Sequence, residues 1–278
     1  MTDTDADTEP TIGLLDAVWA SIIELGAGLD ESQWKLPSEL PGWTVQDNLS
    51  HIIGTERMMQ GVPTPENEPA SMDHVRNPIG AMNEHWVEHY RSMTGAELLD
   101  VFRALRTERL AELRALPPER FDEVGPTPVG EAPFREFLAV RVFDSWIHEQ
   151  DMRRPLGLSG HLSGPVVELS VGRMTKAMPF VVGKKVAPPD GTTVVFVIAA
   201  GRGETGSWTI PVVVDGRATV VDRPPDRPDV RITTDLEAFT AISTGRWDPA
   251  GAAAVERITL DGDEDLGRRV VDQLNFMV

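Results

Sequence analysis

The sequence predicts a two-domain protein, in which an all-α helical bundle is followed by a small α+β domain. Its 278 residues exceed the roughly 100–150 residues of a typical domain. Apolar residues in the first half recur at helical spacing, whereas runs such as TTVVFVIAA in the second half are typical of strands. The composition changes between residues 160 and 190, and we therefore predict domains at 1–165 and 166–278.

The first half reads as a series of helices. Residues 11–29 have apolar side chains near a 3.6-residue period and end at glycines. Thr44 is a suitable N-cap, with Asp47 three residues later, and predicts a helix over Val45–Met59. The remaining expectations are a loop over 60–78, one long helix or two over 81–93 and 96–116, a loop over GPTPVGEAP, and helices over 134–153 and 164–178.

The second half alternates strands and turns before its last helices. TTVVFVIAA, GSWTIPVVVDGRATVVD and DVRITTD are β-rich runs separated by Gly, Asp and Pro. Asp215–Gly216 is a strong hairpin signal. LEAFTAISTG predicts a helix, and RITLDGDEDLGRRVVDQLNFM predicts a strand, a turn and a final helix.

Charge and composition exclude several classes of partner and chemistry. The net charge of −18 repels nucleic acid and anionic membrane surfaces. We expect no membrane span, because no apolar run approaches about 18–20 residues. MTDTDADTEP lacks the features of a secretory signal, so we expect a cytoplasmic protein. The chain has 0 cysteines, which excludes disulfides, thiolate metal ligands and cysteine nucleophiles, and any thiol must come from outside. No oligomeric state is predicted.

Asp144 and His148 form the first candidate metal pair. They lie four residues apart in FDSWIHEQD, and such side chains share one helix face with Cβ atoms about 5–6 Å apart. Arg141 and Asp151 extend the same stripe. The alternative is a solvated polar face on an ordinary amphipathic helix. Both interpretations remain open on periodicity alone.

His51 and the pair His85 and His89 are further candidates. His51 lies on the flank of the apolar stripe of its helix, from which a side chain can reach a neighbouring helix or the surface. His85 and His89, in HWVEH, are also four residues apart and match Asp144 and His148 as a metal pair. We assign no role to His74 and His161, which lie in loop-like sequence.

Two motifs resemble the mycothiol-dependent maleylpyruvate isomerase family of the DinB-like metal-binding superfamily. They are LPGWTVQDNLSHIIGTERMM and RVFDSWIHEQDMRRPLG, and the resemblance spans roughly the first 160 residues. It implies a DinB-like four-helix bundle that holds a divalent metal, typically zinc. VRITTDLEAFTAISTGR and ITLDGDEDLGRRVVDQL resemble the sterol-carrier-protein-like domain that often follows such bundles, although that match is looser.

The resemblance implies His51, Asp144 and His148 as the metal ligands and ranks them above His85 and His89. Three nitrogen and oxygen ligands leave a zinc ion with an open position, which is typical of catalytic sites. By analogy with the family, mycothiol would supply a thiolate for S-transfer to, or cis–trans isomerisation of, an electrophilic small molecule. One departure is Asp144, because the acidic ligand is commonly Glu in isomerase-type members. We therefore favour S-transfer over maleylpyruvate isomerisation itself.

Three other residues, Asp151, Arg246 and Trp43, each allow two interpretations. Asp151 either orients His148 or pairs with Arg153 or Arg154. Arg246, at a helix end in STGRWD, is a candidate catalytic cation for an anionic substrate, or an electrostatic cap of that helix. Trp43 either lines the site or packs in the core. The alternative for the whole protein is a non-enzymatic metal- or apolar-ligand-binding protein with a degenerate site.

Overall fold

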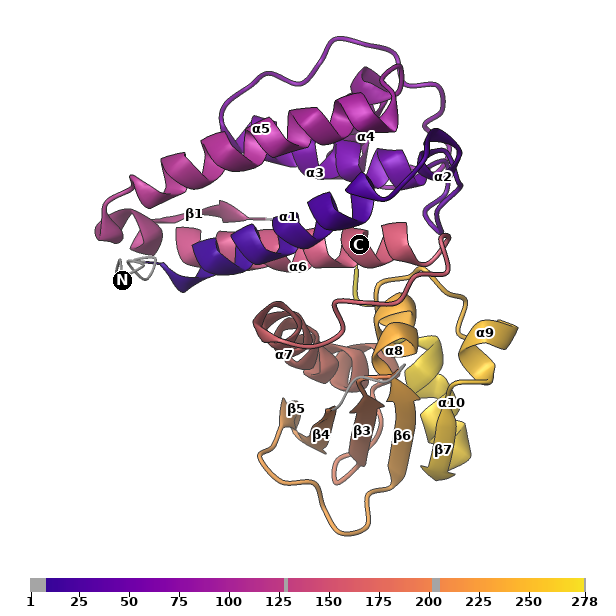
Figure 1. The fold of residues 1–278 in the computed structure, drawn as a ribbon. Coiled ribbons are helices and arrows are strands. Elements are labelled where there is room, and N and C mark those ends of the chain that lie inside the picture. The colour runs from indigo at the N-terminus through magenta and orange to yellow at the C-terminus, as the bar shows by residue number, and fades with distance from the viewer. Residues whose placement is uncertain (1–8, 128–129, 202–205, 278) are drawn as a thin grey trace, which may run out of the picture. The chain divides into compact units, whose positions relative to one another are not determined.

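The computed structural model describes residues 9–127, 130–201 and 206–277, which form two compact units over 1–160 and 161–278. The first unit is helical apart from a short hairpin, and the second is a mixed sheet with helices (Figure 1). The predicted fold class, an all-α bundle followed by an α+β domain, is confirmed. The predicted change of domain at residues 165 and 166 lies at the start of α7 (Pro165–Phe180).

Four helices form the bundle: α1 (Pro10–Ala27), α3 (Val45–Met59), α5 (Gly95–Arg114) and α6 (Phe134–Arg153). α1 and α3 each pack against both α5 and α6. Two further helices are α2 (Glu31–Trp34) and α4 (Pro78–Tyr90), and α4 packs on α3. A 3-10 turn, η1 (Pro118–Asp122), follows α5.

Side-chain caps set where these helices begin. Thr44 and Asp47 form a complete capping box, and α3 has the predicted bounds. Asn77 caps α4, which therefore begins at Pro78, three residues before the predicted start. A second capping box, made by Thr94 and Glu97, starts α5. Of the two predictions for this stretch, separate helices are therefore confirmed.

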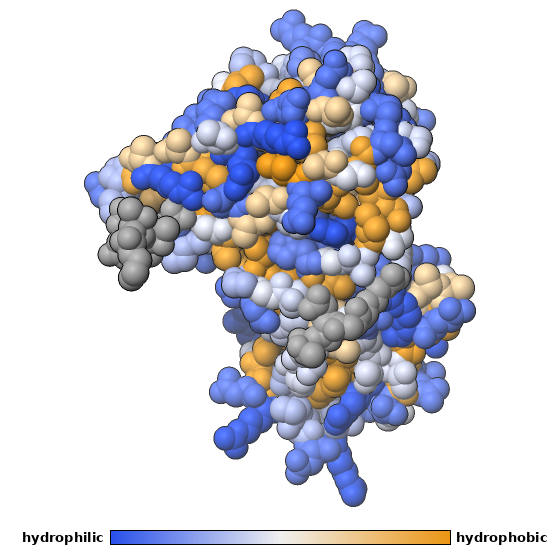
Figure 2. All heavy atoms as spheres, viewed as in Figure 1, coloured by the Kyte–Doolittle hydropathy of each residue, from blue (hydrophilic) through white to orange (hydrophobic). Residues whose placement is uncertain are grey.

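Large apolar side chains fill the bundle. Trp19 of α1 packs edge-on against Phe102 of α5, with ring centroids 6.0 Å apart. α1 is long and apolar enough to cross a membrane by length and composition alone, so the expectation that no segment approaches that limit was wrong. Its apolar stripe is buried among the other helices, which explains that composition without a membrane. On the face drawn in Figure 2, hydrophilic residues cover much of the surface and smaller hydrophobic areas lie between them.

The predicted loop over GPTPVGEAP contains a hairpin instead. β1 (Val124–Thr127) pairs antiparallel with β2 (Gly130–Pro133), and Pro126 lies opposite Glu131. Proline removes a donor from a ladder, but it is tolerated on an edge strand, and both strands of a two-stranded sheet are edges. The many Pro and Gly residues in this stretch predicted a loop, although β1 and β2 pair there.

The sheet of the second unit has the strand order β5-β4-β3-β6-β7. Only β3 and β6 pair in parallel among the described strands. α7 packs on β4 and β5, and α10 on β6 and β7. The predicted hairpin at Asp215–Gly216 is confirmed, with Gly216 at φ 63 between β4 and β5. The bounds are β3 (Thr193–Ala199), β4 (Ser207–Asp215), β5 (Arg217–Val220), β6 (Val230–Asp235), β7 (Thr259–Gly262), α8 (Leu236–Ser243), α9 (Ala252–Val255), α10 (Glu264–Asp272) and η2 (Val181–Val186).

Candidate metal centre

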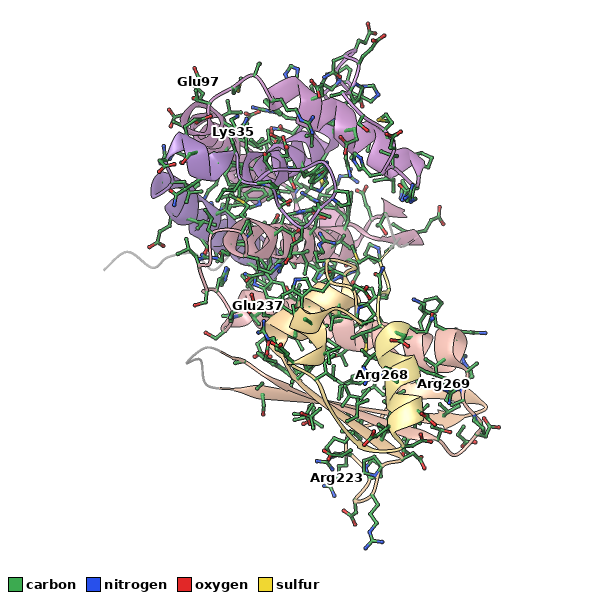
Figure 3. All side chains as sticks on the ribbon, turned by 90° about the vertical axis from the view of Figure 1, so that its right-hand side faces the viewer. Lys35, Glu97, Arg223, Glu237, Arg268 and Arg269 are labelled. Atoms are coloured by element: carbon green, nitrogen blue, oxygen red, sulfur yellow. The ribbon has the colours of Figure 1, made fainter. Side chains whose placement is uncertain are left out.

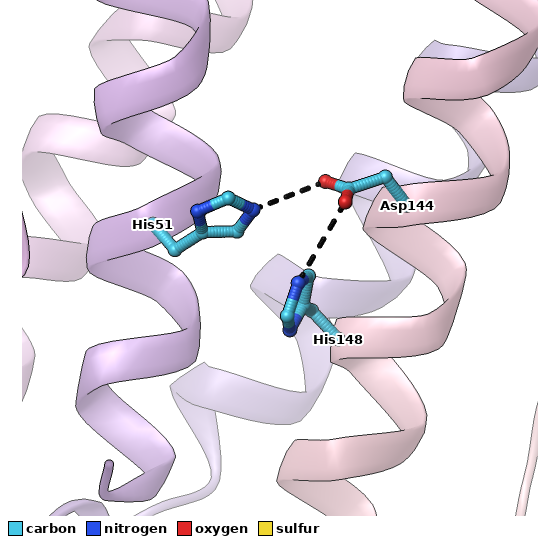
Figure 4. Close-up of side chains that lie close together, drawn as sticks. All are labelled: His51, Asp144 and His148. Atoms are coloured by element: carbon cyan, nitrogen blue, oxygen red, sulfur yellow. Dashed lines mark ion pairs between the residues drawn. The ribbon is translucent and has the colours of Figure 1, made fainter. Parts of the chain in front are cut away.

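Two helices of the bundle bring His51, Asp144 and His148 together. His51 projects from α3 toward Asp144 and His148 on the neighbouring α6 (Figure 4). His51 Nε2 lies 3.3 Å from Asp144 Oδ2, and His148 Nε2 lies 3.7 Å from Asp144 Oδ1. One ligand atom from each residue lies within 4.8 Å of the others. The three residues named from the sequence therefore share one site geometrically.

The distance of 3.3 Å between His51 and Asp144 matches a divalent metal site, and the 3.7 Å between His148 and Asp144 is slightly longer. Ligand atoms about 2.0–2.2 Å from a tetrahedral zinc ion lie about 3.3–3.6 Å from one another. Both ring nitrogens of His51 are buried, and neither has a hydrogen-bond partner among the residues described. Nε2 lies near the carboxylate of Asp144, but the two groups are not oriented for a hydrogen bond. Because a buried polar atom without a partner is costly, this nitrogen fits a cation ligand.

His148 is held through its other ring nitrogen. Nδ1 lies 2.9 Å from Asn48 Oδ1 and 3.2 Å from Asp151 Oδ2, which leaves Nε2 on the side of Asp144. Metal-bound histidines are commonly oriented in this way. Asp151 also pairs with Arg154, so both roles considered for its carboxylate occur together. Arg153 pairs with Glu149 instead.

Asp144 is linked to a series of buried, oppositely charged side chains. Arg141 donates from Nη1 to Asp144 Oδ2 at 2.6 Å and from Nε to Glu56 Oε1 at 2.8 Å. Arg109 of α5 donates to the second oxygen of Glu56 at 3.1 Å. Three helices thus place alternating charges beside the site, and each buried charge has an opposite partner.

The environment sets the protonation of two ligands. Burial disfavours the imidazolium and lowers the pKa of His51, despite the opposing attraction of Asp144. Burial by itself would raise the pKa of Asp144, but the charges of Arg141, His51 and His148 outweigh it and hold that pKa well below its usual range. A neutral imidazole and an ionised carboxylate are the forms that bind metal.

The solvated-face interpretation of FDSWIHEQD is wrong. Arg141, His148 and Asp151 are 3%, 6% and 0% exposed, so this stripe faces the bundle interior. The sequence analysis missed Asn48, Glu56 and Arg109. Asn48 lies three residues before His51 and Glu56 five residues after it, and a run of polar residues on one helix was the available signal.

The competing pair has other partners. His85 Nδ1 lies 3.1 Å from Asn67 Oδ1, and the His89 ring contacts Trp86 and Tyr90 edge-on. Within the described ranges, the group of ligands able to share an ion consists of His51, Asp144 and His148. His74, to which no role was assigned, lies 2.8 Å from Glu84.

Trp43 and Arg246, two further residues singled out in the sequence, lie in different units of the chain. The Trp43 ring lies beside both imidazoles, with centroids 5.4 Å from His51 and 5.9 Å from His148. Trp43 therefore lines the site and is also buried. Arg246 follows α8 in the second unit, and its Nη1 donates to the Thr244 carbonyl at 2.8 Å. That contact at a helix end is the one expected of an electrostatic cap, and the catalytic role stays a prediction.

The fold and the cluster define a class of protein: a DinB-like helical bundle, in which two buried histidines and a partly exposed aspartate form a His-Asp-His set, followed by an α+β domain. A family model described as "Mycothiol maleylpyruvate isomerase N-terminal domain" matches residues 15–153, half of the chain. This chain belongs to that family. A second model, the SCP-2 sterol transfer family, matches residues 178–275.

Individual proteins and solved structures are also similar to this chain. Two uncharacterized proteins of Mycobacterium tuberculosis, from strains CDC 1551 and H37Rv, are each 27% identical over 207 residues, which span 73% of this chain and 78% of theirs. A crystal structure of mycothiol-dependent maleylpyruvate isomerase covers 94% of this chain and 96% of its own, with a TM-score of 0.57 and 16% identity. A variant of that enzyme, with one histidine replaced by alanine, gives a TM-score of 0.55. At this identity the likeness concerns the fold.

Proposed function

We propose that this chain is a cytoplasmic, metal-dependent enzyme that uses a low-molecular-weight thiol, mycothiol, to act on an electrophilic small molecule. The observation that carries this proposal is the buried Nε2 of His51, which has no hydrogen-bond partner among the described residues and lies 3.3 Å from Asp144. The family match supplies the choice of thiol, because the family and a similar structure are both named for mycothiol. The reaction is S-transfer or cis–trans isomerisation.

His51, Asp144 and His148 would hold the metal, and we propose zinc, because two imidazoles and one carboxylate form a known catalytic zinc site. A bound zinc ion acidifies a coordinated thiol and so supplies a thiolate at neutral pH. The chain's own residues lower the pKa of His51, which favours its neutral imidazole, and hold the pKa of Asp144 well below its usual range, which favours its carboxylate. Asp144 is 22% exposed, so the ligand set is reachable from solvent on its side.

Asp144 favours S-transfer over isomerisation of maleylpyruvate. Asp is one methylene shorter than the Glu expected in isomerase-type members, so an ion would lie closer to α6. Such a displacement changes where an electrophile meets the thiol, and a shift of about 1 Å can cost about 100-fold in rate. We therefore expect the thiol chemistry to be retained and the fit to maleylpyruvate to be lost.

The first experiment measures metal content. The purified parent should contain about one equivalent of zinc, and the His51→Ala, His148→Ala double variant should contain none. His85→Ala is the matched control, since His85 contacts Asn67 and should leave the zinc content unchanged. A parent that stays free of metal after zinc is supplied contradicts the proposal.

The second experiment tests the reaction with mycothiol. The zinc-loaded parent is assayed with maleylpyruvate and, separately, with an aryl halide electrophile. Activity that requires both zinc and mycothiol supports the proposal, and the active substrate decides between isomerisation and S-transfer. Tight zinc binding without thiol-dependent turnover of either substrate indicates the degenerate, non-enzymatic alternative.

Arg246 is our candidate for a catalytic cation. The net charge of −18 makes the electrostatic field of the protein repel anions, so binding of an anionic substrate needs a local cation. Arg246→Met should lower activity toward an anionic substrate without changing zinc content. Arg223→Met is the control, because Arg223 extends outward from the connection between β5 and β6 (Figure 3). Equal activities in the two variants would exclude this role.

The alternative of an apolar-ligand carrier has less support. It predicts that the three metal ligands lie too far apart to share an ion, whereas they lie within 4.8 Å of one another. The second unit has an open cavity of about 400 Å³, but its lining includes the carboxylates of Asp248 and Asp272 beside Ile242 and Val271. Carboxylates are unfavourable neighbours for an apolar ligand.

A further inference from the structure

The two imidazoles of the candidate centre are held in different ways. His148 is oriented by Asn48 and Asp151 through its Nδ1. Nδ1 of His51 is buried and has no hydrogen-bond partner among the residues that the structure describes. Metal-bound imidazoles are usually oriented by a hydrogen bond from the nitrogen that does not bind the ion. Another contact must therefore set the orientation of the His51 ring.

The ring of Trp43 supplies that contact. Its ring is tilted by 39° from the His51 ring and by 32° from the His148 ring, at centroid distances of 5.4 and 5.9 Å. The two imidazole centroids are 4.5 Å apart, so one indole lies close to both rings. A large, rigid and buried ring in this place restricts the rotation of both imidazoles.

Trp43 is itself tethered by a buried carboxylate. Its Nε1 donates to Glu84 Oε1 at 2.6 Å, and Glu84 is 3% exposed. Hydrogen bonds to an ionised acceptor are roughly twice as strong as neutral ones. His74 Nε2 lies 2.8 Å from the same oxygen of Glu84. The chain of contacts therefore runs from His74 through Glu84 to Trp43 and then to the metal ligands.

His74 belongs to a long connection between α3 and α4 that lies along α4. Asn67 donates to the His85 carbonyl at 2.9 Å, and the backbone N–H of Ala70 donates to Glu88 at 3.3 Å. His74 also lies against Gly42, where an added Cβ would be 3.2 Å from His74 Cε1. The connection is thus attached to α4 at several points, and its His74 lies beside Gly42, the residue that precedes Trp43.

We propose that Trp43 is a positioning residue of the metal centre, tethered by Glu84 and His74, and that its ring replaces the missing hydrogen bond to His51 Nδ1. This inference rests on the proposed function, because it concerns the same site. It assigns a role to the connection over residues 61–77, which carries His74 to Glu84. It also explains a buried Glu84 that contacts none of the three ligands directly.

The test replaces zinc by cobalt(II), whose visible absorption reports the geometry of its ligands, in the full-length protein. Trp43→Phe keeps a ring but removes the N–H, and Glu84→Leu removes the acceptor while leaving Trp43 intact. Each variant should bind cobalt about 10-fold more weakly, in the range of outer-shell substitutions, with a changed absorption spectrum. Glu84→Gln keeps an acceptor oxygen, although a neutral one, and its affinity and spectrum should lie closer to those of the parent than those of Glu84→Leu do.

His85→Ala is the matched control, because it changes the next residue of α4 but keeps the hydrogen bond from Asn67 to the carbonyl of residue 85 and leaves Trp43, Glu84 and His74 unchanged. Its cobalt spectrum should equal that of the parent. Parent-like spectra and affinities in Trp43→Phe and Glu84→Leu would overturn the inference and leave Trp43 with a packing role. If Trp43→Phe does not fold, the comparison of Glu84→Leu with Glu84→Gln decides. A parent that binds neither zinc nor cobalt instead contradicts the proposed function.

Discussion

Arg141 donates a hydrogen bond to Asp144 Oδ2 at 2.6 Å, so a buried cation already engages one oxygen of the candidate metal ligand. The same guanidinium binds Glu56, and Arg109 binds the other oxygen of Glu56. Arg141 therefore compensates two carboxylates in a part of the bundle where burial makes an unpaired charge costly. The pairing keeps Asp144 ionised and in place without a metal ion, and leaves Oδ1 on the side of His148.

Replacement of Arg141 by Met should destabilise the metal-free protein. Because Asp144 and Glu56 lose a shared partner, we expect the free energy of unfolding to fall by about 3–5 kcal/mol. Added zinc should restore part of this loss, since the ion compensates Asp144. Urea unfolding, followed by tryptophan fluorescence with chelator or with zinc, measures both effects. Arg103→Met is the control, because Arg103 pairs with Asp100 at the surface and should change stability by less than about 1 kcal/mol.

Zinc should stabilise the folded bundle through the three ligands. With free zinc at about one hundred times its Kd, the expected gain is about 2.7 kcal/mol in the free energy of unfolding. His51→Ala should abolish the gain, and His85→Ala should retain it. Thermal unfolding with and without a chelator checks this prediction. A chelator that leaves the unfolding temperature of the parent unchanged would contradict it.

Two substitutions at Asp144 should separate the charge of the ligand from its length. Asp144→Glu keeps the carboxylate and should retain about one equivalent of zinc. Asp144→Asn removes the charge and should weaken zinc binding by more than the roughly 10–100-fold typical of outer-shell changes. Competition with a coloured chelator measures both affinities. Similar zinc affinities in Asp144→Asn and the parent would show that this side chain is not a ligand.

Gly95→Ala should destabilise the bundle although alanine favours helices. An added Cβ at residue 95 would lie 2.1 Å from the ring of Trp34, which has to shift. We expect a loss of about 1–3 kcal/mol from this overpacking. Gly80→Ala in α4 is the control, because its nearest new contact is 3.4 Å away and it should gain up to about 1 kcal/mol. Urea unfolding of both variants decides, and equal stabilities would refute the packing argument.

Local sequence determined the two helices that carry the metal ligands. The Thr44 and Asp47 capping box and the apolar period place α3 and α6 where they were predicted, because caps and periodicity act over a few residues. The spacing of Asp144 and His148 followed from α6 alone. The hairpin over β1 and β2 was missed because its pairing is not visible in a Pro- and Gly-rich composition.

The sequence by itself determined the order of domains, the helix register of each ligand and, through a resemblance, the set of His51, Asp144 and His148. Only the tertiary structure decided that the polar stripe of α6 faces inward, that Arg141 meets Glu56, and that Trp43 lies close to two imidazoles. The physical reason is distance along the chain. Arg141 and Glu56 lie on different helices, and Trp43, just before α3, reaches His148 on α6. Such contacts depend on how each helix is rotated when the apolar faces pack, and local propensity does not encode that rotation.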